Sequence, residues 1–492
     1  YEFLKEKIEY LLEIISEKLS IIHNIQEDKE YWRVIIYMWL NQYVSVVFDR
    51  WEIIRIFFEK NKKEKFYSNF ISFSDLDYIP RNHSDFRTIS MHHEWNHLLY
   101  LRLFHFLNIE NLSLIEKKFI KNNLKKEKFR KIKNTSLIIY TIKLVQNVIS
   151  KFVFRFNKVI FEGSFPKKEF LKICLKNNLI PYKNLYFFDF DIKRRSSLSE
   201  NKRTQFKELM MGINIQDKFI RFILLNLHKD IPRSYLEDFD AIKKNIFPLS
   251  QKKKIILSMH FLHINDNFKI YIAETKKVGS KYIYLGHGGG LTLRIDPDFD
   301  FFQKVSHKRE IDINKGQAYM GNGEQNHSFF LEGMSPTLPI IKLKNLKKGS
   351  NCSIIFFEVT KYISKFSGGV PKLDQHFELF NEITKFVNEL NPEIKSKIKF
   401  RSKKSSNEVT NFLHTNSNKK FSELFGKKSI DVHSRQNPYK KTILNSKLII
   451  ATYAQTAFSE AMYSNVPTIL IIKKEHCQFS KEALKTFDDL KK

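Results

Sequence analysis

Cysteine is scarce in this chain, and so are glycine and long apolar runs. The three cysteines among 492 residues lie far apart, at Cys174, Cys352 and Cys477, which excludes a small disulfide-stabilised scaffold and favours a reducing compartment. No apolar run approaches the ~20 residues that a membrane-spanning helix needs. At 42% apolar and 14% aromatic residues, the chain is too hydrophobic to be disordered or fibrous. We therefore expect a cytoplasmic protein of two or three globular domains.

Acidic residues are scarce relative to basic ones: 84 Lys and Arg against 53 Asp and Glu leave a formal net charge of +31. A field of that sign attracts polyanions, which include nucleic acid, phosphorylated substrates and the anionic face of a membrane. The abundance of Lys, Asn, Ile and Phe is equally typical of an AT-rich genome, so the charge alone does not identify the partner. It is compatible with peripheral contact between the chain and the inner face of a membrane.

The N-terminal part of the chain is rich in helical patterns. The run from Leu11 to Ile22 and the segment at residues 31–59 both carry apolar side chains at helical spacing. Trp32, Trp39 and Trp51 lie at such spacings in the second segment, which predicts that they belong to the core. Short apolar runs predict buried strands farther along the chain, at residues 153–156, 255–260, 269–273 and 282–285.

Strands alternate with helices in the C-terminal part, which begins after a Pro- and Lys-containing stretch at residues 336–350. The predicted strands cover residues 353–359, 398–401, 430–433, 447–452 and 468–472. The predicted helices cover residues 374–390, 454–464 and 480–492. Strands that alternate with helices of this length imply right-handed crossovers and a parallel sheet. We therefore predict an α/β fold with a domain boundary near residue 345.

A glycine-rich motif, Gly286-His287-Gly288-Gly289-Gly290, follows the predicted strand at residues 282–285 and holds four of the chain's 15 glycines. Ligands of open parallel sheets bind at the carboxyl ends of strands, where this motif lies. Its glycines permit positive φ and let backbone N–H groups close around an anion or a sugar. His287 is thereby a candidate general base or phosphate ligand. The alternative is a flexible turn with an incidental histidine.

Hydroxyl-bearing residues follow another predicted strand, where Thr452-Tyr453-Ala454-Gln455-Thr456 opens a helix that also contains Glu460. The N-terminus of a helix is a ready phosphate site. Glu460 lies four residues after Thr456, so both side chains project from one face, where the carboxylate can accept hydrogen bonds from a ribose diol. The alternative assigns Thr456 to a helix cap and Glu460 to surface charge.

The segment from Asp431 to Tyr439 overlaps the end of a short predicted strand and is rich in polar residues. Its His433 and Arg435 could neutralise a pyrophosphate, to which Arg435 can make two hydrogen bonds. Lys399 and Arg401, at the end of a third strand, add positive charge to the same rim. The alternative is a polar connection before the next helix.

One motif has the pattern of a zinc site. His93-Glu94-Trp95-Asn96-His97 satisfies H-E-x-x-H, in which two histidines one helical turn apart hold zinc and the glutamate acts as base. A third ligand is not identifiable, although Glu110 and Glu116 are candidates. The chain has 16 histidines, so chance matches are common, and the segment is also suited to packing.

The apolar helix predicted at residues 31–59 contains the charged side chains Arg33, Asp49 and Arg50 among its apolar residues. A buried charge is strongly destabilising unless it is paired. These residues therefore either pair with one another or line a cleft, and the sequence does not choose between the two.

Together these motifs resemble a family of transferases encoded in bacterial surface-carbohydrate loci. The resembling stretches keep the family's order over most of the chain: Tyr31-Trp32-Arg33, Asp49-Arg50, Glu94 to His97, Gly286 to Gly290, Thr452 to Thr456 with Glu460, and Pro467-Thr468. The resemblance implies a fold like that of two-domain GT-B glycosyltransferases, in which two Rossmann-like sheets face each other across a cleft. It also implies further sequence before Tyr1 and after Lys492.

On this resemblance, residues 1–345 form a helix-rich acceptor-side domain that ends in Rossmann-like strands, and residues 346–492 form a Rossmann-like nucleotide-donor domain. The spacing from Glu460 to Pro467 is similar to the Glu…Pro segment on which such enzymes bind the donor nucleotide. Sialyltransferase-like and glycerophosphotransferase-like relatives often carry a His-Pro pair, which is absent from this sequence, so a cytidine-activated donor is not favoured.

The leading hypothesis is transfer of a sugar or related group from a nucleotide-activated donor to a surface glycan or a lipid-linked acceptor. The donor-binding candidates are Gly286, Gly288, Gly289, Gly290, Thr452, Tyr453, Thr456 and Glu460. The catalytic candidates are His287 as base, with His433 and Arg435 opposing the charge of the leaving group.

No cofactor is expected besides the nucleotide-activated substrate, and no metal, because no Asp-x-Asp motif follows the predicted strands of the C-terminal part. Asp189-Phe190-Asp191 has the letters but lies in the first half, where it can simply end a strand. One alternative is a non-catalytic nucleic-acid-binding protein, for which the charge and the 46 Phe and 20 Tyr residues available for stacking argue. Another is a zinc hydrolase that uses His93, Glu94 and His97. The leading hypothesis includes no specific nucleic-acid partner.

Overall fold

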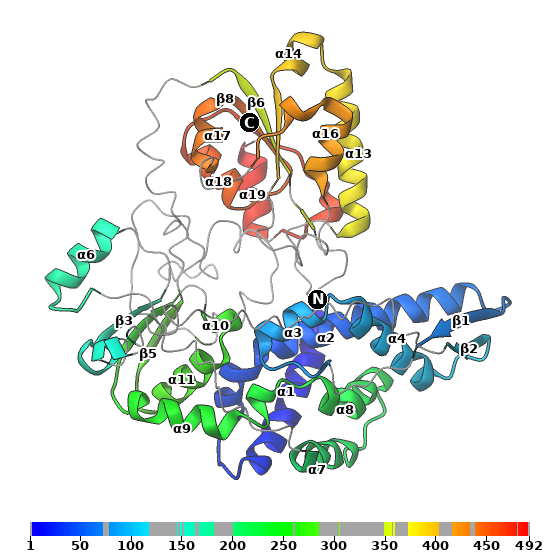
Figure 1. Cartoon of the computed structure of the whole chain (residues 1–492), viewed down its shortest axis with the longest axis vertical. Helices are drawn as coiled ribbons and strands as arrows, with labels where there is room; N and C mark the ends of the chain where they lie inside the picture. Colours follow the sequence, from blue (N-terminus) through cyan, green and yellow to red (C-terminus); the bar gives the residue numbers. More distant parts are fainter. Residues whose placement is uncertain are drawn as a thin grey trace. The chain divides into compact units, whose positions relative to one another are not determined.

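The computed structural model divides the chain into two compact units (Figure 1). The N-terminal unit comprises residues 1–163 and 173–282, and the C-terminal unit comprises residues 164–172 and 283–492. The structure describes residues 2–71, 78–117, 145, 148–149, 152–162, 167–181, 200–258, 261–284, 305, 349–356, 358–359, 372–402, 416–432, 438–479 and 481–490. The domain boundary predicted near residue 345 lies outside them and stays a prediction. The fold class is α/β, with parallel sheets and a helix-rich N-terminal part, as the sequence predicts.

Helices make up most of the N-terminal unit. They are α1 (Glu2–Ile22), α2 (Lys29–Lys60), α3 (His83–Ile89), α4 (His93–Leu107), α7 (Glu200–Met211), α8 (Lys218–Asp230), α9 (Phe239–Ser250), α10 (Phe261–Ile264) and α11 (Asp266–Lys277), with a 3-10 turn at Arg233–Tyr235. Strands β1 (Phe66–Phe70) and β2 (Leu112–Glu116) pair in parallel. A second sheet has the order β3 (Val159–Glu162), β4 (Ile255–Ser258), β5 (Lys281–Tyr284), with β3 parallel to β4. Helix α6 (Lys167–Lys176) follows β3 along the chain.

Helix α2 contacts α1, α4, α8 and α11 and contains much of the core of this unit. Asp28 caps its start, because the carboxylate accepts a hydrogen bond from the backbone N–H of Tyr31 at 2.8 Å. Trp32 and Trp39 are fully buried and Trp51 is 7% exposed, which confirms that the three tryptophans belong to the core. The indole N–H of Trp32 donates to Ser20 Oγ of α1 at 2.8 Å, so its polar atom is satisfied inside the core.

A buried carboxylate joins three helices of the N-terminal unit. Asp230, at the end of α8, is 2% exposed. It accepts hydrogen bonds from Tyr43 Oη of α2, from Trp95 Nε1 of α4, and from two guanidinium nitrogens of Arg102, also on α4. Each of these donors would be destabilising if it were buried without an acceptor, so the network favours this packing of α2, α4 and α8 over others.

The charges that interrupt α2 are paired as well. Arg33 forms an ion pair with Glu9 of α1, with 2.7 Å between Nη2 and Oε2. Arg50 contacts the carboxylate of Asp49 at 2.6 Å and donates from Nε to Asn96 Oδ1 of α4 at 3.0 Å. Of the two alternatives that the sequence left open, the structure shows pairing, with partners on neighbouring helices as well as on α2.

Two of the predicted strands are helical. Residues 269–273 lie in α11, where every residue from Phe268 to Thr275 is buried, so no polar face reveals the helical period. The signal that identifies this helix is Asn265, which caps it by accepting from the backbone N–H of Phe268 at 2.9 Å. Residues 152–156 are also helical, and so short a run does not determine its period. The strands predicted from residues 255 and 282 are confirmed as β4 and β5.

A parallel sheet forms the centre of the C-terminal unit. Its strands are β6 (Asn351–Phe356), β7 (Ile398–Ser402), β8 (Ser446–Ala451) and β9 (Thr468–Leu470), in the spatial order β7-β6-β8-β9. Ile430 forms a parallel bridge to Phe400 beside β7, which is what the described residues retain of the strand predicted at residues 430–433. The predicted parallel sheet is confirmed. If β6, β7, the Ile430 bridge, β8 and β9 are numbered first to fifth along the chain, their order across the sheet is third-second-first-fourth-fifth.

Helices cover both faces of this sheet. They are α13 (Leu373–Glu389), α14 (Pro392–Ser396), α16 (Ser417–Phe425), α17 (Tyr439–Asn445), α18 (Thr456–Tyr463) and α19 (Lys481–Leu490), with 3-10 turns at Lys427–Ser429 and Lys474–His476. The core on one face joins α13 and α16 to β6 and β7, through Ile354, Leu379, Phe400 and Phe421. The core on the other face joins α17 and α18 to β6 and β8, through Ile355, Ile443, Ile449 and Ala461. Figure 1 shows the two helix pairs on opposite sides of the sheet.

The three cysteines are buried as free thiols. Burial disfavours the thiolate and raises the pKa of each thiol, to about 11 for Cys477. Cys352 belongs to the core of α13 and α16, and Cys477 packs in a core with α19, so both behave as small apolar side chains. In the part of the chain that the structure describes, no helix combines the length and the apolarity needed to cross a membrane.

Replacing Asp230 by alanine is expected to destabilise the N-terminal unit by about 3–5 kcal/mol, because Arg102 would remain largely buried without its carboxylate. Asp230→Asn keeps the shape of the side chain and should be less damaging. The measurement is the shift of the thermal unfolding midpoint, with the exposed Glu208→Gln on α7 as control, whose effect should stay within about 0.5 kcal/mol. A midpoint for Asp230→Ala equal to that of the control would contradict the structural role of this network.

Candidate functional site

The strand order of the C-terminal sheet reverses between β6 and β8. The chain leaves β6 through α13 toward β7 on one side, and it leaves β8 through α18 toward β9 on the other. The connections after β6 and β8 therefore diverge at the carboxyl edge of the sheet, which is where open α/β sheets bind ligands. We refer to Glu358, Arg401, Asp431 and Tyr453, which lie at or just after the strand ends, together with Thr456 and Glu460 in the first part of α18, as the switch edge.

Thr452 ties β8 to β6 at this reversal. Its backbone N–H and its hydroxyl both donate to the carbonyl oxygen of Ile355, at 3.2 and 3.1 Å, and the residue is 1% exposed. The hydroxyl is therefore used within the sheet, where it holds the two strand ends together. Through this attachment Thr452 determines where the chain continues into Tyr453.

Helix α18 begins directly at the switch edge. Gln455 is its N-cap residue, and the Gln455 side chain makes no capping hydrogen bond. Thr456 and Glu460 are both half-buried and lie one turn apart at the start of this helix. The positive end of the helix dipole and the first-turn amides consequently point to the edge, as in known phosphate sites.

Arg401 brings a buried positive charge to the switch edge. It lies near the end of β7, in register with Ile355 of β6, and its side chain is 5% exposed. Its Nη1 lies 3.3 Å from Oδ2 of Asp431, and its guanidinium carbon lies 5.8 Å from the centre of the Tyr439 ring. Asp431 accepts a hydrogen bond from Thr442 Oγ1 at 2.6 Å. This polar group fastens the start of α17 to the end of β7.

The charges of Glu460 and Arg401 both affect the pKa values of two tyrosines, Tyr453 and Tyr439. Burial and the Glu460 carboxylate raise the pKa of Tyr453 to about 12, although the Arg401 guanidinium lowers it. Burial, Tyr453 and Glu460 raise the pKa of Tyr439 well above its usual value, and Tyr439 Oη donates to the carbonyl oxygen of Ala457 at 2.9 Å. Both hydroxyls are therefore protonated at neutral pH, and the four side chains act as one electrostatic group.

A second polar group lies at the end of β6, and the sequence interpretation missed it. The carboxylate of Glu358 accepts hydrogen bonds from the backbone N–H of Ser417 at 3.0 Å and from its hydroxyl at 3.1 Å. Ser417 Oγ also lies 3.2 Å from Nε2 of the buried His376, whose ring packs edge-on to Phe356. A carboxylate at the start of α16 complements the helix dipole. Because Glu358 follows β6 so closely, the rule that ligand-binding residues follow parallel strands could have identified it.

The structure brings together only some of the predicted site residues. Tyr453, Thr456 and Glu460 lie at the switch edge with Arg401. Lys399 Nζ donates to the carbonyl oxygen of Lys428 at 2.6 Å, which holds it at the neighbouring 3-10 turn. The candidates that lie outside the described residues are Gly286, His287, Gly288, Gly289, Gly290, His433, Arg435 and Asp189-Phe190-Asp191.

The H-E-x-x-H motif forms the start of α4. His97 Nε2 lies 3.1 Å from the backbone nitrogen and 3.2 Å from the carbonyl oxygen of Ile71. Asn96 is buried and accepts the hydrogen bond from Arg50 of α2. Over the described ranges, no group of three or more His, Cys, Asp or Glu side chains is arranged to hold a metal ion. The contacts of this motif are those of packing, and they give no support to the zinc hydrolase alternative.

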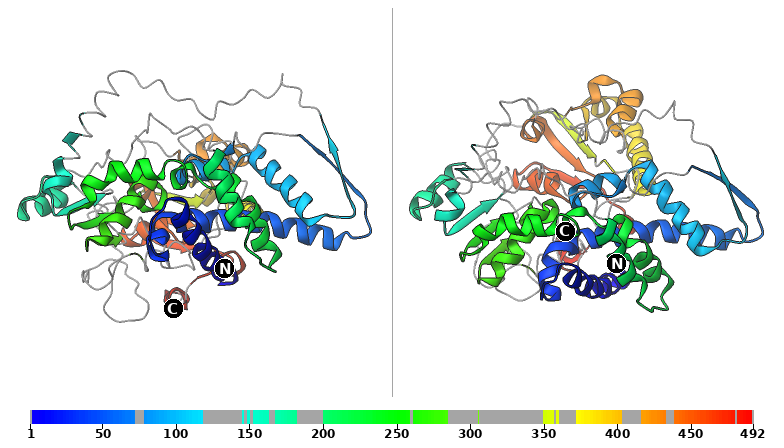
Figure 2. Two further views of the ribbon diagram at one scale, coloured as in Figure 1. Left: turned by 90° about the horizontal axis from the view of Figure 1, so that it is seen from below. Right: turned by 60° about the horizontal axis from the view of Figure 1, so that its bottom comes forward.

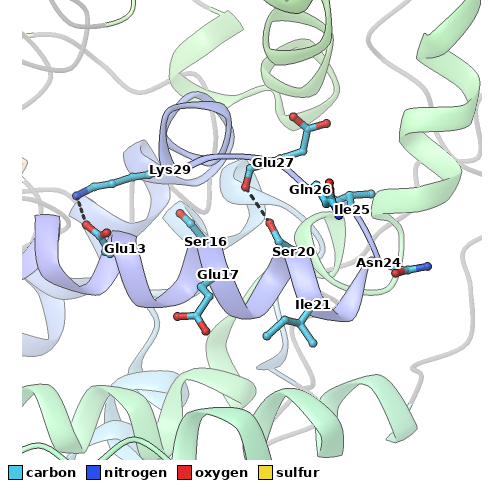
Figure 3. Close-up of a pocket in the computed structure, with 10 residues that line it drawn as sticks. All are labelled: Glu13, Ser16, Glu17, Ser20, Ile21, Asn24, Ile25, Gln26, Glu27 and Lys29. Carbon is cyan, nitrogen blue, oxygen red and sulfur yellow. Dashed lines mark hydrogen bonds and ion pairs between the residues drawn. The ribbon is translucent and has the colours of Figure 1, made fainter.

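A groove of about 710 Å³ lies where α1 turns into α2 (Figure 3). Lys29 Nζ reaches the Glu13 carboxylate at 2.7 Å, and Ser20 Oγ donates to the carbonyl oxygen of Glu27 at 3.2 Å. Glu17 and Glu27 also line the groove, so its lining has three carboxylates and one lysine. A phosphate would be repelled there, and the groove contains none of the predicted site residues. It is therefore not a candidate nucleotide site.

Glu460→Gln is expected to lower the pKa of Tyr453 from about 12 toward its usual value near 10, because the neutral amide no longer opposes the phenolate. The measurement is a titration of the tyrosine ring carbons in ¹³C-labelled protein, with Tyr453→Phe to assign the signal. The exposed Glu389→Gln, at the far end of α13, is the control and should leave the titration unchanged.

The direction of the shift also determines how Tyr453 contributes to stability. Its folded-state pKa lies above the unfolded value, so its contribution is complete below about pH 10 and is lost as the pH rises from about 10 to 12. A Tyr453 titration in Glu460→Gln that matches the unmodified chain would show that the two side chains do not interact.

The comparisons with known proteins cover the whole chain. No curated protein and no solved structure matches it significantly. The family model described as LIC12162 family transferase, in contrast, matches residues 1–492, a span that includes the helix-rich N-terminal unit as well as the switch edge. The chain therefore belongs to the LIC12162 family of transferases.

Proposed function

We propose that this transferase moves a sugar or related group from a nucleotide-activated donor to a surface glycan or a lipid-linked acceptor. The observation that carries the proposal is the third-second-first-fourth-fifth order of the C-terminal sheet, which reverses beside Tyr453, Thr456 and Glu460. That order is typical of the nucleotide-binding halves of doubly wound folds. A transferase with a nucleotide-activated donor needs such a site, and the switch edge offers one.

The donor phosphates would bind at the start of α18, beside Thr452, Tyr453 and Thr456. The start of that helix, where the Gln455 side chain makes no capping hydrogen bond, supports this assignment, because backbone amides and the helix dipole favour an anion there. The neutral hydroxyl of Tyr453 is suited to donate a hydrogen bond to a phosphate oxygen. Glu460, one turn along the helix, is placed to accept hydrogen bonds from the two ribose hydroxyls.

The transfer step breaks the bond between the transferred group and a phosphate oxygen, and negative charge develops on the departing nucleotide. We assign His433 and Arg435 to oppose that charge, and Gly286, Gly288, Gly289 and Gly290 to enclose the donor through their backbone amides. His287 would accept the proton of the acceptor hydroxyl, or bind phosphate if the reaction retains configuration. The new bond forms from the acceptor oxygen to the transferred group.

The proposal includes neither a metal nor a further cofactor. Residues 346–492, the proposed donor domain, contain no Asp-x-Asp motif, so the counter-charge would come from the α18 N-terminus and from His433 and Arg435. Testing the donor-dependent reaction in the presence of a chelator separates this arrangement from a metal-dependent one.

A GT-B-like arrangement is part of the proposal. The N-terminal unit contains a three-stranded sheet in which β3 and β4 are parallel, and the C-terminal unit contains the larger parallel sheet. Two such sheets support an acceptor-side domain at residues 1–345 and a donor domain at residues 346–492. We propose that the protein works in the cytoplasm, in contact with the inner face of the membrane where lipid-linked acceptors lie.

One member of a panel of UDP-, GDP-, CMP- and CDP-linked compounds is expected to raise the thermal unfolding midpoint, because a ligand that binds only the folded chain stabilises it. Glu460→Gln should weaken that binding about 10- to 100-fold, since hydrogen bonds to a charged acceptor are lost. Calorimetric titration of both proteins measures the difference, and Glu389→Gln should bind like the unmodified chain.

Two outcomes would overturn this assignment. One is the absence of stabilisation by any nucleotide together with tight, steeply salt-dependent binding of random oligonucleotides, which would favour the nucleic-acid-binding alternative. The other is equal donor binding by Glu460→Gln and by Glu389→Gln, which would place the nucleotide elsewhere.

His287→Ala is expected to reduce the turnover of the donor found in that panel by about 10²- to 10⁴-fold, because a general base is removed from the reaction. Binding of the donor should change little, so the loss appears in kcat and not in Kd. Release of the nucleotide product measures the rate, and the thermal midpoint shows whether the variant is folded. A folded His287→Ala variant with full turnover would exclude this histidine as the base.

A further inference from the structure

The end of α2 and the small sheet beside it form a projecting arm, residues 52–70 and 111–117. We infer that this arm docks on an anionic lipid surface. Figures 1 and 2 show β1 and β2 at the far end of α2, where α4 also contacts α2 through Phe104 and Phe58. The inference does not depend on the proposed donor site, because all the residues that carry it lie in the N-terminal unit.

Aromatic rings join the sheet of the arm to the end of α2, although one of them, Phe57, is 44% exposed. The ring of Phe66, on β1, lies 5.0 Å from that of Phe57 and 5.5 Å from that of Phe58, both on α2. Phe58 in turn contacts Phe104 of α4 at 6.2 Å. Burial alternates along β1, so the residues next to Phe66 are directed away from this aromatic cluster.

The arm exposes large apolar side chains on its two-stranded sheet and on the end of α2. Tyr67 of β1 is 71% exposed and Ile115 of β2 is 43% exposed, and both lie on the outer face of the two-stranded sheet. On α2, Ile53 is 51% exposed and Ile56 is 41% exposed, one helical turn apart. Exposed apolar side chains that gather on one projecting element are typical of an interaction surface.

Basic residues accompany these apolar side chains. The turn from α2 into β1 carries the exposed lysines Lys60, Lys62, Lys63 and Lys65, with Glu64 as its single acidic residue. Arg55, farther up α2, is already paired with Glu52 and Glu59 and adds little. The sequence after β2 continues the same charge, since residues 117–134 contain nine Lys or Arg and one Glu.

This combination fits an anionic membrane surface better than a protein partner. Tyrosine favours the headgroup region, aliphatic side chains enter just below it, and each lysine near anionic lipid contributes about 1 kcal/mol. Neither signal is sufficient alone, but apolar insertion and a basic cluster together give stable attachment without a membrane span. An acidic protein partner would pair with the lysines but would leave the apolar side chains of Ile53, Ile56 and Tyr67 exposed to water.

The experiment is flotation of the full chain with vesicles of phosphatidylglycerol mixed with phosphatidylcholine, and with vesicles of phosphatidylcholine alone. We expect binding to the anionic vesicles that weakens as salt is added. Replacing Lys60, Lys62, Lys63 and Lys65 by glutamine should lower the partition coefficient about tenfold or more. The matched control replaces the exposed Lys218, Lys244, Lys252 and Lys253 of the same unit, which removes the same charge elsewhere and should change binding much less.

A second pair of variants tests the apolar side chains. Ile53→Ser, Ile56→Ser and Tyr67→Ser together should weaken the binding to anionic vesicles severalfold without altering its salt dependence. The control replaces Met211, Phe247 and Val278, which are similarly exposed on other elements, and should bind normally. Circular dichroism and the unfolding midpoint verify that each variant is folded.

Three results would overturn the inference. The first is that the full chain does not bind anionic vesicles. The second is that the arm variants and their matched controls lose vesicle binding equally, which would assign the binding to net charge. The third is concentration-dependent dimerisation without lipid that the apolar arm variant abolishes, which would make a second copy of the chain the partner of this surface.

Discussion

Parallel pairing of β7, β6, β8 and β9 is the constraint on which the functional argument depends. Because all four strands run in one direction, each strand end and the start of each following helix lie at the same edge of the sheet. Residues separated by some sixty positions in sequence, such as Arg401 and Glu460, therefore influence the same phenol, Tyr453. The two hydrogen bonds from Thr452 to Ile355 hold the reversal point of that edge in place.

The N-terminal unit uses its polar residues differently. Lys269 is fully buried, and its Nζ donates to Asp266 Oδ1 at 2.8 Å and to Tyr235 Oη at 3.0 Å, with His83 Nδ1 at 2.9 Å. Burial lowers the pKa of this lysine, while Asp266 opposes the change. Such networks join distant segments and leave little polar surface for a substrate. The family match covers the whole chain, but the polar residues of this N-terminal network hold the fold together and are not assigned to catalysis.

The architecture could be predicted from the sequence where the length and spacing of the apolar runs distinguish helix from strand. The alternation after residue 350 predicted the strands and helices of the C-terminal sheet, and the tryptophan spacing predicted the core of α2. The pattern failed at residues 269–273, because a helix buried on all sides has no polar face and its apolar run reads as a strand. The switch edge was predicted in part. Strand ends indicated Tyr453, Thr456 and Glu460, and the same rule could have indicated Glu358, but its contact with Ser417, and through Ser417 with His376, joins distant segments that no local pattern records.

The net charge of +31 does not explain recognition at the switch edge. The buried charge of Arg401 is offset by Asp431, and Glu358 and Glu460 add two carboxylates to the same rim. A phosphate drawn there by a diffuse positive field would meet local negative charge. In the proposed function, recognition would therefore come from oriented groups: the amides and dipole of α18 for the phosphates, and Glu460 for neutral hydroxyls that a carboxylate attracts. A ligand with both an anionic and a diol part matches this arrangement, whereas a plain polyanion does not.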